Sequence, residues 1–351
     1  MHERAGSPQA RASAAHVGRR RPTCAGALAL GVAVPALICP HDAKPLKEDD
    51  GFFRCTGGHS FPVLRGIPRF VEGDTYSNAF GLQWRLHPRT QLDSYTRTTL
   101  SRDRARRALS PRLFDALEGL SVLEVGCGAG RFTEVLLEAG ALVTSVDLSD
   151  AVDANQENFP QGDRHRIAQA DVYALPFPAM SYDVVFCLGV VQHTPSPEQT
   201  IAALYEQVKP GGWLALDHYT DRLRWYLSTA PAFRAVLRRL PAADGLRLTD
   251  ALVRCLFPLH RRAATGLPGV LLRRISPIQT YYHAFPELPE DVQREWSYLD
   301  THDVLTDWYK HFRTAAQIEA TLHDLGLEDV EVTKGGNGVE ARARRPLGGH
   351  A

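Results

Sequence analysis

The stretch Val122-Leu-Glu-Val-Gly-Cys-Gly-Ala-Gly-Arg-Phe132 decides the fold of this 351-residue chain. The apolar run over 121–125 predicts a buried parallel strand, and the helical spacing of apolar residues over 131–138 predicts a helix. Between them the backbone must turn sharply and let a ligand come close, which explains the three glycines Gly126, Gly128 and Gly130. A helix that begins at such a turn offers free N–H groups and a positive dipole end.

The spacing of these glycines separates two kinds of nucleotide site. A nicotinamide-binding turn has the pattern G-x-G-x-x-G, and Arg131 stands where its last glycine would be. The pattern is instead E-x-G-x-G-x-G, with Glu124 on the expected strand. It resembles the first motif of class I S-adenosylmethionine-dependent methyltransferases. The resemblance implies an S-adenosyl-L-methionine site that includes Glu124, Gly126, Cys127, Gly128 and Gly130.

The residues from about 120 to 220 match the same family in order and spacing. A second apolar run ends in Asp147, whose carboxylate can accept both ribose hydroxyls of a nucleoside. Asp171 looks like the residue of the adenine-contacting turn, and a fourth strand over 182–187 leads into the next loop. The implied cofactor site is completed by residues that adjoin these positions: Leu148, Val172 and Leu188.

The end of the chain predicts the rest of the sheet. Thr314 and Gln317 have the spacing of a capping box that opens a helix reaching about residue 325. Strands are expected over 330–334 and 339–343, and the Gly335-Gly-Asn-Gly338 turn between them is a strong hairpin signal. The expected fold is therefore α/β, with a Rossmann-like seven-stranded methyltransferase sheet that ends in an antiparallel hairpin, a small N-terminal ribbon and a helical insertion.

This reading divides the chain into five parts. Residues 1–33 have the basic-then-apolar order of a secretory signal, but the apolar part is short and no convincing cleavage site follows, so a disordered tail is expected. The other parts are a zinc-ribbon-like module over 34–72, an N-terminal helical cover over 73–118, a methyltransferase core over 119–218 and 313–345, and a helical insertion over 219–312.

The module over 34–72 looks like a degenerate zinc ribbon. Two tight turns would each present ligands to one tetrahedral ion, with Cys39 in the first turn and Cys55 and His59 in the second. Asp42 or His41 would complete the site. Such ribbons precede the catalytic domain in several methyltransferases, including ribosomal-RNA guanine methyltransferases. One structural zinc ion and a metal-free relic are both compatible with this pattern.

The cover and the insertion are expected to surround the ligand crevice. Gln83 and Trp84 either line its mouth or serve ordinary helix packing. An insertion that leaves a strand at its carboxyl end lies over the crevice, so 219–312 is expected to form a substrate lid. Amphipathic helices with arginine pairs are expected over 230–240, 246–257 and 270–275. Their basic and apolar faces would suit a membrane surface, or the arginines are simply solvated.

Composition narrows the class of protein. Lys+Arg and Asp+Glu both number 40, so the chain has no large positive field and a nucleic-acid substrate is unlikely. Cys127 and Cys187 fall in expected buried elements, which indicates reduced thiols and a cytoplasmic location. The sequence predicts no transmembrane segment and leaves the oligomeric state open.

The expected activity is methyl transfer from S-adenosyl-L-methionine to a small-molecule acceptor of specialised or glycolipid metabolism. His193 is the candidate base, because its loop faces the reacting methyl group and an imidazole titrates near neutral pH, although a structural role is equally compatible. Two alternatives remain: a ribosomal or transfer RNA methyltransferase, favoured by the ribbon, and a non-catalytic scaffold that retains the methyltransferase fold.

Overall fold

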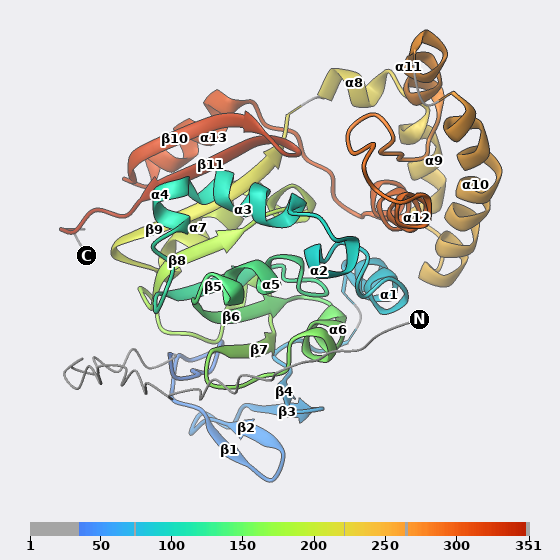
Figure 1. Cartoon of the computed structure of the whole chain (residues 1–351). Coiled ribbons are helices and arrows are strands. Elements are labelled where there is room, and N and C mark those ends of the chain that lie inside the picture. The colour runs from blue at the N-terminus through green and yellow to red at the C-terminus, as the bar shows by residue number, and fades with distance from the viewer. Residues whose placement is uncertain (1–34, 74, 221, 264–265, 349–351) are drawn as a thin grey trace, which may run out of the picture. The chain divides into compact units, whose positions relative to one another are not determined.

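The computed structural model describes residues 35–73, 75–220, 222–263 and 266–348 (Figure 1). The tail expected over residues 1–33 lies outside these described residues. The described residues form two sheets, a four-stranded one near the N-terminus and a seven-stranded one that carries the glycine motif.

The seven-stranded sheet has the order β10-β11-β9-β8-β5-β6-β7. Its parallel strands are β5 (Ser121–Val125), β6 (Leu142–Asp147), β7 (His165–Gln169), β8 (Tyr182–Cys187) and β9 (Val208–Tyr219). The strands β10 (Glu328–Gly335) and β11 (Gly338–Arg344) form the terminal hairpin, and β11 pairs antiparallel with β9. This topology confirms the Rossmann-like methyltransferase sheet with its antiparallel end.

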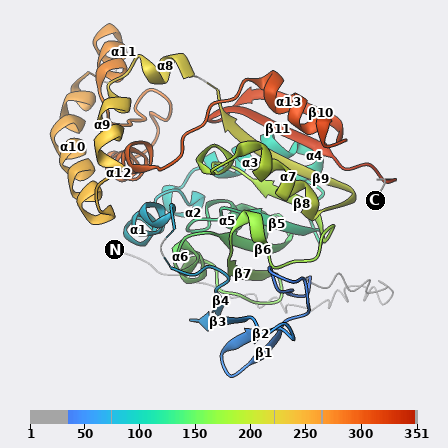
Figure 2. The same cartoon turned by 180° about the vertical axis from the view of Figure 1, so that it is seen from behind.

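Alternate strand residues enter two separate apolar clusters, one on each face of the sheet. Leu123 and Val125 of β5 pack in the cluster that contains residues of α7 and α13, whereas Val122 packs in the cluster of α3, α4 and α5. Figure 2 shows the sheet from the face opposite to that of Figure 1. These helices are α3 (Leu100–Leu109), α4 (Pro111–Phe114), α5 (Arg131–Glu138), α7 (Pro197–Gln207) and α13 (Ala315–Asp324). A further helix, α6 (Ala151–Asn158), contacts β6 and β7.

The four-stranded sheet forms the N-terminal module. All its neighbouring strands are antiparallel: β1 (Lys47–Asp49), β2 (Phe52–Arg54), β3 (Ser60–Leu64) and β4 (Ile67–Pro68). Directly after β4, the Phe70 N–H donates to the Gln169 carbonyl at 2.8 Å, so the chain pairs with the outermost parallel strand, β7. The buried Arg69 guanidinium reaches Asp153 of α6 at 2.6 Å. These contacts fasten the module to one edge of the main sheet.

The helical cover is held by side chains that cap helix ends. It contains α1 (Asn78–Leu86) and α2 (Asp93–Thr96) and continues into α3. The Glu134 carboxylate accepts the Asp93 and Ser94 N–H groups at 2.8 and 3.2 Å. The Asp93 carboxylate in turn accepts two N–H groups at the start of α3, both at 2.9 Å. Acceptors at free helix N–H groups stabilise the first turn, so this relay orients α2 and α3 on α5.

The insertion leaves the sheet after β9 and returns to the same point. The Arg313 N–H donates to the Tyr219 carbonyl at 2.9 Å, which joins the two ends. Its helices are α8 (Arg222–Tyr226), α9 (Ala230–Leu237), α10 (Ala242–Arg262), α11 (Gly266–Ile275) and α12 (Glu290–Thr306). The three expected helices are present, and α8 and α12 are two that the sequence did not predict. Over the described part of the chain, each helix is too short or too polar to cross a bilayer.

Candidate active site

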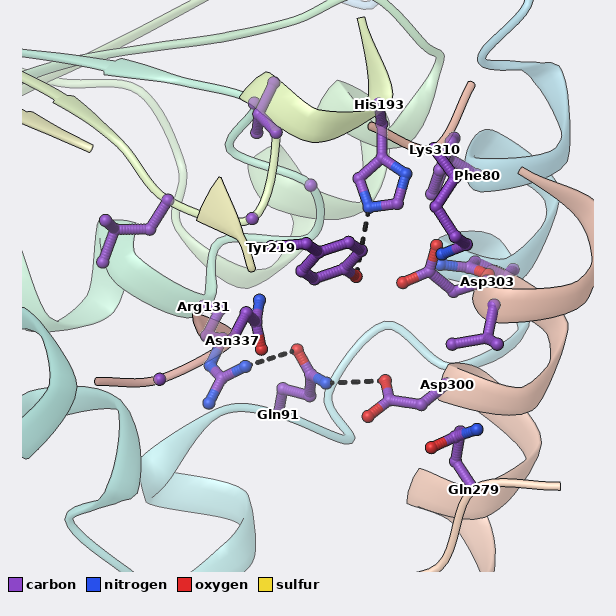
Figure 3. A pocket seen from close by; sticks show the side chains of 18 of the residues that line it. Phe80, Gln91, Arg131, His193, Tyr219, Gln279, Asp300, Asp303, Lys310 and Asn337 are labelled. Carbon is purple, nitrogen blue, oxygen red and sulfur yellow. Dashed lines mark hydrogen bonds between the residues drawn. The ribbon is translucent and has the colours of Figure 1, made fainter. Parts of the chain in front are cut away.

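A cavity of about 1100 Å³ lies at the carboxyl ends of the parallel strands. Its floor includes the glycine turn after β5, Asp147 at the end of β6 and the Leu188–Val190 segment after β8. Tyr219 at the end of β9 also lines it (Figure 3). The cover contributes Gln83 and Trp84, and the insertion contributes the opposite wall. The cavity thus joins the cofactor motif to the expected substrate lid.

The glycine turn is held closely against neighbouring chain. The N–H groups of Gly126 and Cys127 both donate to the Val146 carbonyl, at 2.8 and 3.0 Å. Gly126 has a φ of 77°, and a Cβ there would lie 2.1 Å from Val190. A Cβ on Gly128 would lie 3.0 Å from the Trp84 ring. A side chain at either position would therefore displace the walls of the cavity or fill the space above the turn.

Asp147 keeps part of its acceptor capacity. Its Oδ2 accepts the Gly128 N–H at 2.9 Å, and its Oδ1 accepts the N–H and hydroxyl of Ser149 at 2.8 and 2.7 Å. Burial raises the pKa of this carboxyl, while these hydrogen bonds oppose the shift. A carboxylate has about four lone-pair sites, so one remains on Oδ2 for a hydroxyl in the cavity.

The other implied cofactor residues fall into two groups. Cys127, Leu148, Val172 and Leu188 line the cavity together with Gly126, Gly128 and Asp147. Three lie outside the lining. Gly130 is the N-cap residue of α5 and faces the Phe159 ring, and the Asp171 carboxylate accepts the Tyr173 N–H at 3.0 Å. Glu124, the third, is buried within the sheet.

Glu124 lies beneath the site rather than in it. Its carboxylate accepts the hydroxyls of Thr133 on α5 and Ser145 on β6, the latter at 2.8 Å. Its other oxygen, Oε1, is buried and has no hydrogen-bond partner. Burial raises the pKa of Glu124 to about 7. Glu124 therefore links β5 to α5 and to β6, the three elements that position the glycine turn.

His193 is buried at the edge of the cavity. Its Nδ1 lies 3.0 Å from Asp307 Oδ2, and its Nε2 lies 3.3 Å from the Tyr219 hydroxyl (Figure 3). Asp307 is also paired with Lys310 at 2.7 Å and with Arg234 at 2.5 Å. Burial alone would raise the pKa of Asp307, but Lys310, His193 and Arg234 outweigh it and hold the pKa at about 2. This ionised partner was not predicted from the sequence.

Two further carboxyls of α12 line the cavity and were missed by the sequence reading. Asp300 accepts Gln91 at 3.1 Å and the Tyr281 hydroxyl, and burial raises its pKa to about 7. Burial also raises the pKa of Asp303, whose carboxylate lies within 4.8 Å of the ring nitrogen of His193. Their spacing of one helical turn places both on one face of α12. The sequence shows two aspartates three residues apart, but this spacing indicates a shared face only on a helix, and α12 was not predicted.

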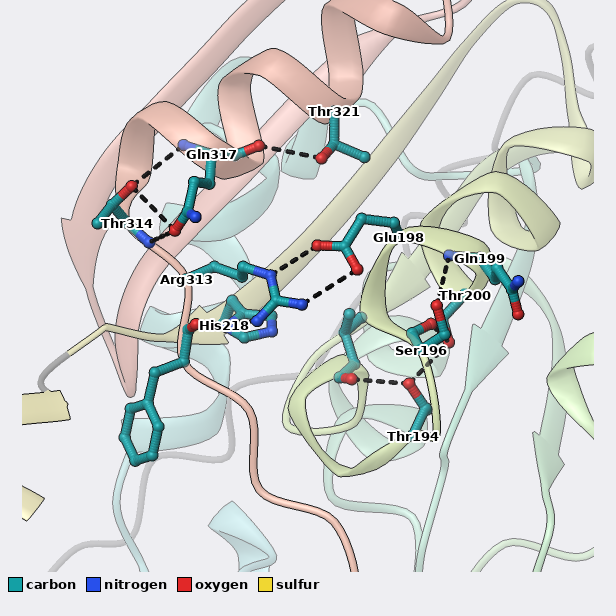
Figure 4. Close-up of polar contacts among 12 residues, drawn as sticks. Thr194, Ser196, Glu198, Gln199, Thr200, His218, Arg313, Thr314, Gln317 and Thr321 are labelled. Atoms are coloured by element: carbon teal, nitrogen blue, oxygen red, sulfur yellow. Dashed lines mark hydrogen bonds and ion pairs between the residues drawn. The ribbon is translucent and has the colours of Figure 1, made fainter.

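The loop that carries His193 is braced from the side of α7. The Thr200 hydroxyl donates to Thr194 at 2.7 Å, and Arg313 binds both carboxylate oxygens of Glu198 at 2.6 and 3.1 Å (Figure 4). The predicted capping box follows immediately, with the Gln317 N–H donating to Thr314 at 3.2 Å and the Thr314 N–H donating to Gln317 at 2.9 Å. These contacts hold the C-terminal end of the insertion, at Arg313, beside the loop that carries His193.

The four candidate metal ligands of the N-terminal module meet at one point. The ligand atoms of Cys39, Asp42, Cys55 and His59 all lie within 4.8 Å of one another. His59 Nδ1 is 3.4 Å from each of the two sulfur atoms and 3.7 Å from the Asp42 carboxylate. A Cβ on Gly57 would lie 1.9 Å from Asp42, so the second turn requires glycine here. Asp42, and not His41, belongs to this group.

The sequence comparisons find proteins that are similar to the core of this chain. A family model described as a methyltransferase domain matches residues 123–216. The ubiquinone biosynthesis O-methyltransferase of Leptothrix cholodnii is 34% identical over 135 residues, which are 36% of this chain and 55% of that protein. The enzyme of the same name from Nitrosospira multiformis is 35% identical over 128 residues, 36% of this chain and 54% of that protein. The chain spans about half the length of the curated relatives it matches.

The solved structures that the chain resembles are more distant in sequence. Magnesium protoporphyrin IX methyltransferase from Synechocystis is 18% identical, with 77% of this chain and 96% of that chain covered and a TM-score of 0.42. A putative S-adenosylmethionine-dependent methyltransferase from Methanococcus maripaludis is 13% identical, with 79% and 97% covered and a TM-score of 0.41. The residues matched by the family model, 123–216, begin within β5 and end within β9, so they include the glycine turn and Asp147.

Proposed function

We propose that this chain transfers a methyl group from S-adenosyl-L-methionine to a small-molecule acceptor held between the glycine turn and α12. The observation that carries the proposal is the cavity itself. It joins Asp147 and the turn at Gly126 and Gly128 to a wall of α12 that bears Asp300 and Asp303. Catalysis of this kind depends chiefly on holding two reactants in line and excluding water, and the cover and the insertion that line the cavity would contribute to both.

The lining fits the cofactor. The remaining lone pair of Asp147 suits a ribose hydroxyl, and the bare backbone at Gly126 and Gly128 leaves room for a ligand at close range. Leu148 and Val172 offer apolar contacts to a flat base. The cofactor, when bound, supplies an electrophilic methyl group, so the protein itself needs to provide only binding, orientation and a place for a proton.

We propose that His193 accepts the proton that the acceptor's nucleophile loses. As the carbon–sulfur bond breaks and the bond from the acceptor to carbon forms, a hydroxyl or amine nucleophile must lose its proton. His193 and Tyr219 both line the cavity, with the Tyr219 hydroxyl 3.3 Å from His193 Nε2, and the ionised Asp307 beside Nδ1 would stabilise the imidazolium that results. The relatives are named O-methyltransferases, which supports an oxygen nucleophile here. The matched relatives cover 36% of this chain, and we propose an acceptor of specialised or glycolipid metabolism.

An RNA acceptor is less well supported. The ribbon over 34–72 carries five basic and five acidic residues, so it has no excess charge with which to bind a phosphate backbone. A non-catalytic scaffold would have no need of a buried imidazole paired with an ionised carboxylate. The cavity, with its aromatic and polar lining, favours a small molecule.

Calorimetry with S-adenosyl-L-methionine and its demethylated product tests the proposal. Asp147→Ala removes a charged acceptor from the ribose, so affinity should fall by about 10- to 100-fold, equivalent to roughly 1.5–3 kcal/mol. Asp163→Ala removes an exposed carboxylate that follows the next helix and serves as the matched control. Equal affinity of wild type and Asp147→Ala would refute the cofactor assignment, whereas a loss in both variants would indicate a general effect.

We further propose that the N-terminal module holds one structural zinc ion through Cys39, Cys55, His59 and Asp42. A tetrahedral zinc ion places its ligand atoms about 3.5 Å apart, given its usual bond lengths. The separations of 3.4 to 3.7 Å among these atoms agree with that geometry. Two thiolates, an imidazole and a carboxylate are ligands that zinc accepts.

A further inference from the structure

The insertion exposes an unusual amount of apolar surface. Among the described residues, eleven of the eighteen exposed large hydrophobic side chains lie between Leu223 and Ile275. On α11 they follow one helical face, at positions 267, 270, 271 and 275, and this face points to solvent while Gly269 is buried. Ordinary surface helices bury such a face. We call the exposed aliphatic side chains of α8, its flanking residue and α11 the apolar face: Leu223, Leu227, Leu267, Val270, Leu271 and Ile275.

The same segment concentrates positive charge. Residues 222–275 contain eleven arginines and two aspartates, an excess of nine positive charges in a chain whose net charge is zero. Arg274 is exposed on the apolar face itself, and Arg261 and Arg262 are exposed at the end of α10, shortly before α11 begins. An apolar helix face with arginines at its border is the pattern of a helix that lies in the headgroup region of an anionic bilayer.

The apolar face borders the mouth of the cavity. Leu223, Leu227 and Val270 belong to the face and also line the cavity, as does Arg274. The hydroxyl of Thr229, just after α8, donates to the Ile275 carbonyl at the end of α11, so the two parts of the face are joined. Figure 1 shows both helices in the insertion, which leaves the sheet at the carboxyl end of β9.

We propose that the apolar face docks on an anionic lipid bilayer and that a lipophilic acceptor enters the cavity from it. The second half of this statement rests on the proposed methyltransferase function. Arginines at the border would meet lipid phosphates while the leucines enter the acyl boundary. A second copy of the chain would bring the same positive charge to the face and be repelled, which argues against self-association as the reason for the exposure. Docking would be interfacial, because the helices are α11, of ten residues, and the shorter α8.

Vesicle flotation of the full chain tests the docking. Binding is expected to vesicles of equimolar phosphatidylcholine and phosphatidylglycerol, to be weaker with phosphatidylcholine alone, and to fall as salt is raised. Leu271→Glu should reduce partitioning at least about tenfold, since it replaces a leucine that would be buried in lipid by a charge. Leu64→Glu is the matched control, because both leucines are 55% exposed and Leu64 lies in the N-terminal module. Neither Leu271 nor Leu64 lines the cavity.

The outcomes separate this inference from the proposed function. If wild type binds neither vesicle, or Leu64→Glu and Leu271→Glu lose binding equally, the docking proposal is wrong. A concentration-dependent dimer that Leu271→Glu abolishes would make the face a self-interface and overturn it as well. Calorimetry with S-adenosyl-L-methionine in the absence of lipid checks the function independently. Cofactor binding that is intact in Leu271→Glu, together with lost flotation, would support both.

Discussion

At the scale of single residues, the site separates side chains that contact ligands from those that shape the turn. Glu124 belongs to the second kind, because it is fully buried between Thr133 and Ser145 and does not line the cavity. A buried carboxyl with one unpartnered oxygen prefers its protonated form. We therefore expect Glu124 to affect the pH dependence of the free energy of unfolding rather than the contacts with a ligand.

Glu124→Gln is expected to stabilise the protein at alkaline pH and to have little effect at acid pH. The folded-state pKa of about 7 lies above the value of 4.5 for a free carboxyl, so the folded state binds the extra proton between these values. The free energy of unfolding of wild type should fall as pH rises from about 5 to 8, by at most about 3 kcal/mol from this group. Glutamine stays neutral and should lack this contribution.

Urea unfolding at several pH values measures the difference. Glu157→Gln, at an exposed position on α6, is the control and should follow wild type. Parallel pH curves for wild type and Glu124→Gln would show that Glu124 is ionised throughout and that its burial is compensated in some other way.

His193→Gln tests the proton-accepting role. Loss of a positioned base is expected to lower kcat by roughly 10²- to 10⁴-fold, while the affinity for S-adenosyl-L-methionine stays within about twofold. His323→Gln, on the exposed side of α13, should change neither. If the affinity for the cofactor falls as much as kcat does, His193 serves to hold the loop in place and is not the base.

At the scale of elements, the N-terminal module is the part whose stability depends on a ligand. Its apolar cluster is small and includes Cys39, Cys55 and Phe61. A module of this size gains much of its folding free energy from a metal when it binds one. The two halves of the proposed site come from two turns on either side of β1 and β2, so the ion would hold them together.

The purified protein is expected to contain about one zinc ion per chain when it is produced with sufficient zinc. Chelation should then speed amide exchange over residues 38–70 and leave β5, β6 and β8 protected. Cys55→Ser should lose the ion, whereas Cys255→Ser, at an exposed thiol of α10, should retain it. Metal analysis that finds no zinc would leave a ribbon held by packing alone.

At the scale of the whole molecule, the insertion is connected to the core in two ways. Its ends meet at Tyr219 and Arg313, so a short linker can close the gap. Its helix α12 also packs on the cover, where Trp84 contacts the cluster of Trp296, and Gln91 donates to Asp300. The cover in turn lies over Gly128.

Replacing residues 220–312 with a short Gly/Ser linker is expected to abolish methyl transfer and to weaken cofactor binding without eliminating it. The cofactor motif remains complete, but Trp84 loses packing partners on α12. Turnover and cofactor affinity are measured on a variant whose sheet is shown to be folded by circular dichroism. Unchanged turnover would eliminate the lid hypothesis, and complete loss of cofactor binding would show that the insertion belongs to the cofactor site.

The sequence predicted what depends on local pattern and missed what depends on distant contacts. The periodicity of 131–138 and the cap at Thr314 are properties of neighbouring residues, and both are confirmed by α5 and α13. The helix α12 was missed because its many polar residues face the cavity and other helices, which obscures a simple apolar stripe. Asp307 becomes a partner of His193 only when α12 folds back on the histidine loop, across more than a hundred residues.

The pairing of residues 69 and 70 with β7 has a consequence for solubility. An open sheet edge offers unpaired N–H and C=O groups to any other strand, and parallel sheets have no charged outer face to discourage this. The segment after β4 occupies part of that edge, with the Phe70 N–H bound to Gln169 and Arg69 bound across to Asp153. Should the ribbon unfold, for instance after losing a metal ion, the core would be left intact but with a strand free to recruit a neighbour. In its folded state the N-terminal module therefore protects the protein against aggregation, whether or not it takes part in catalysis.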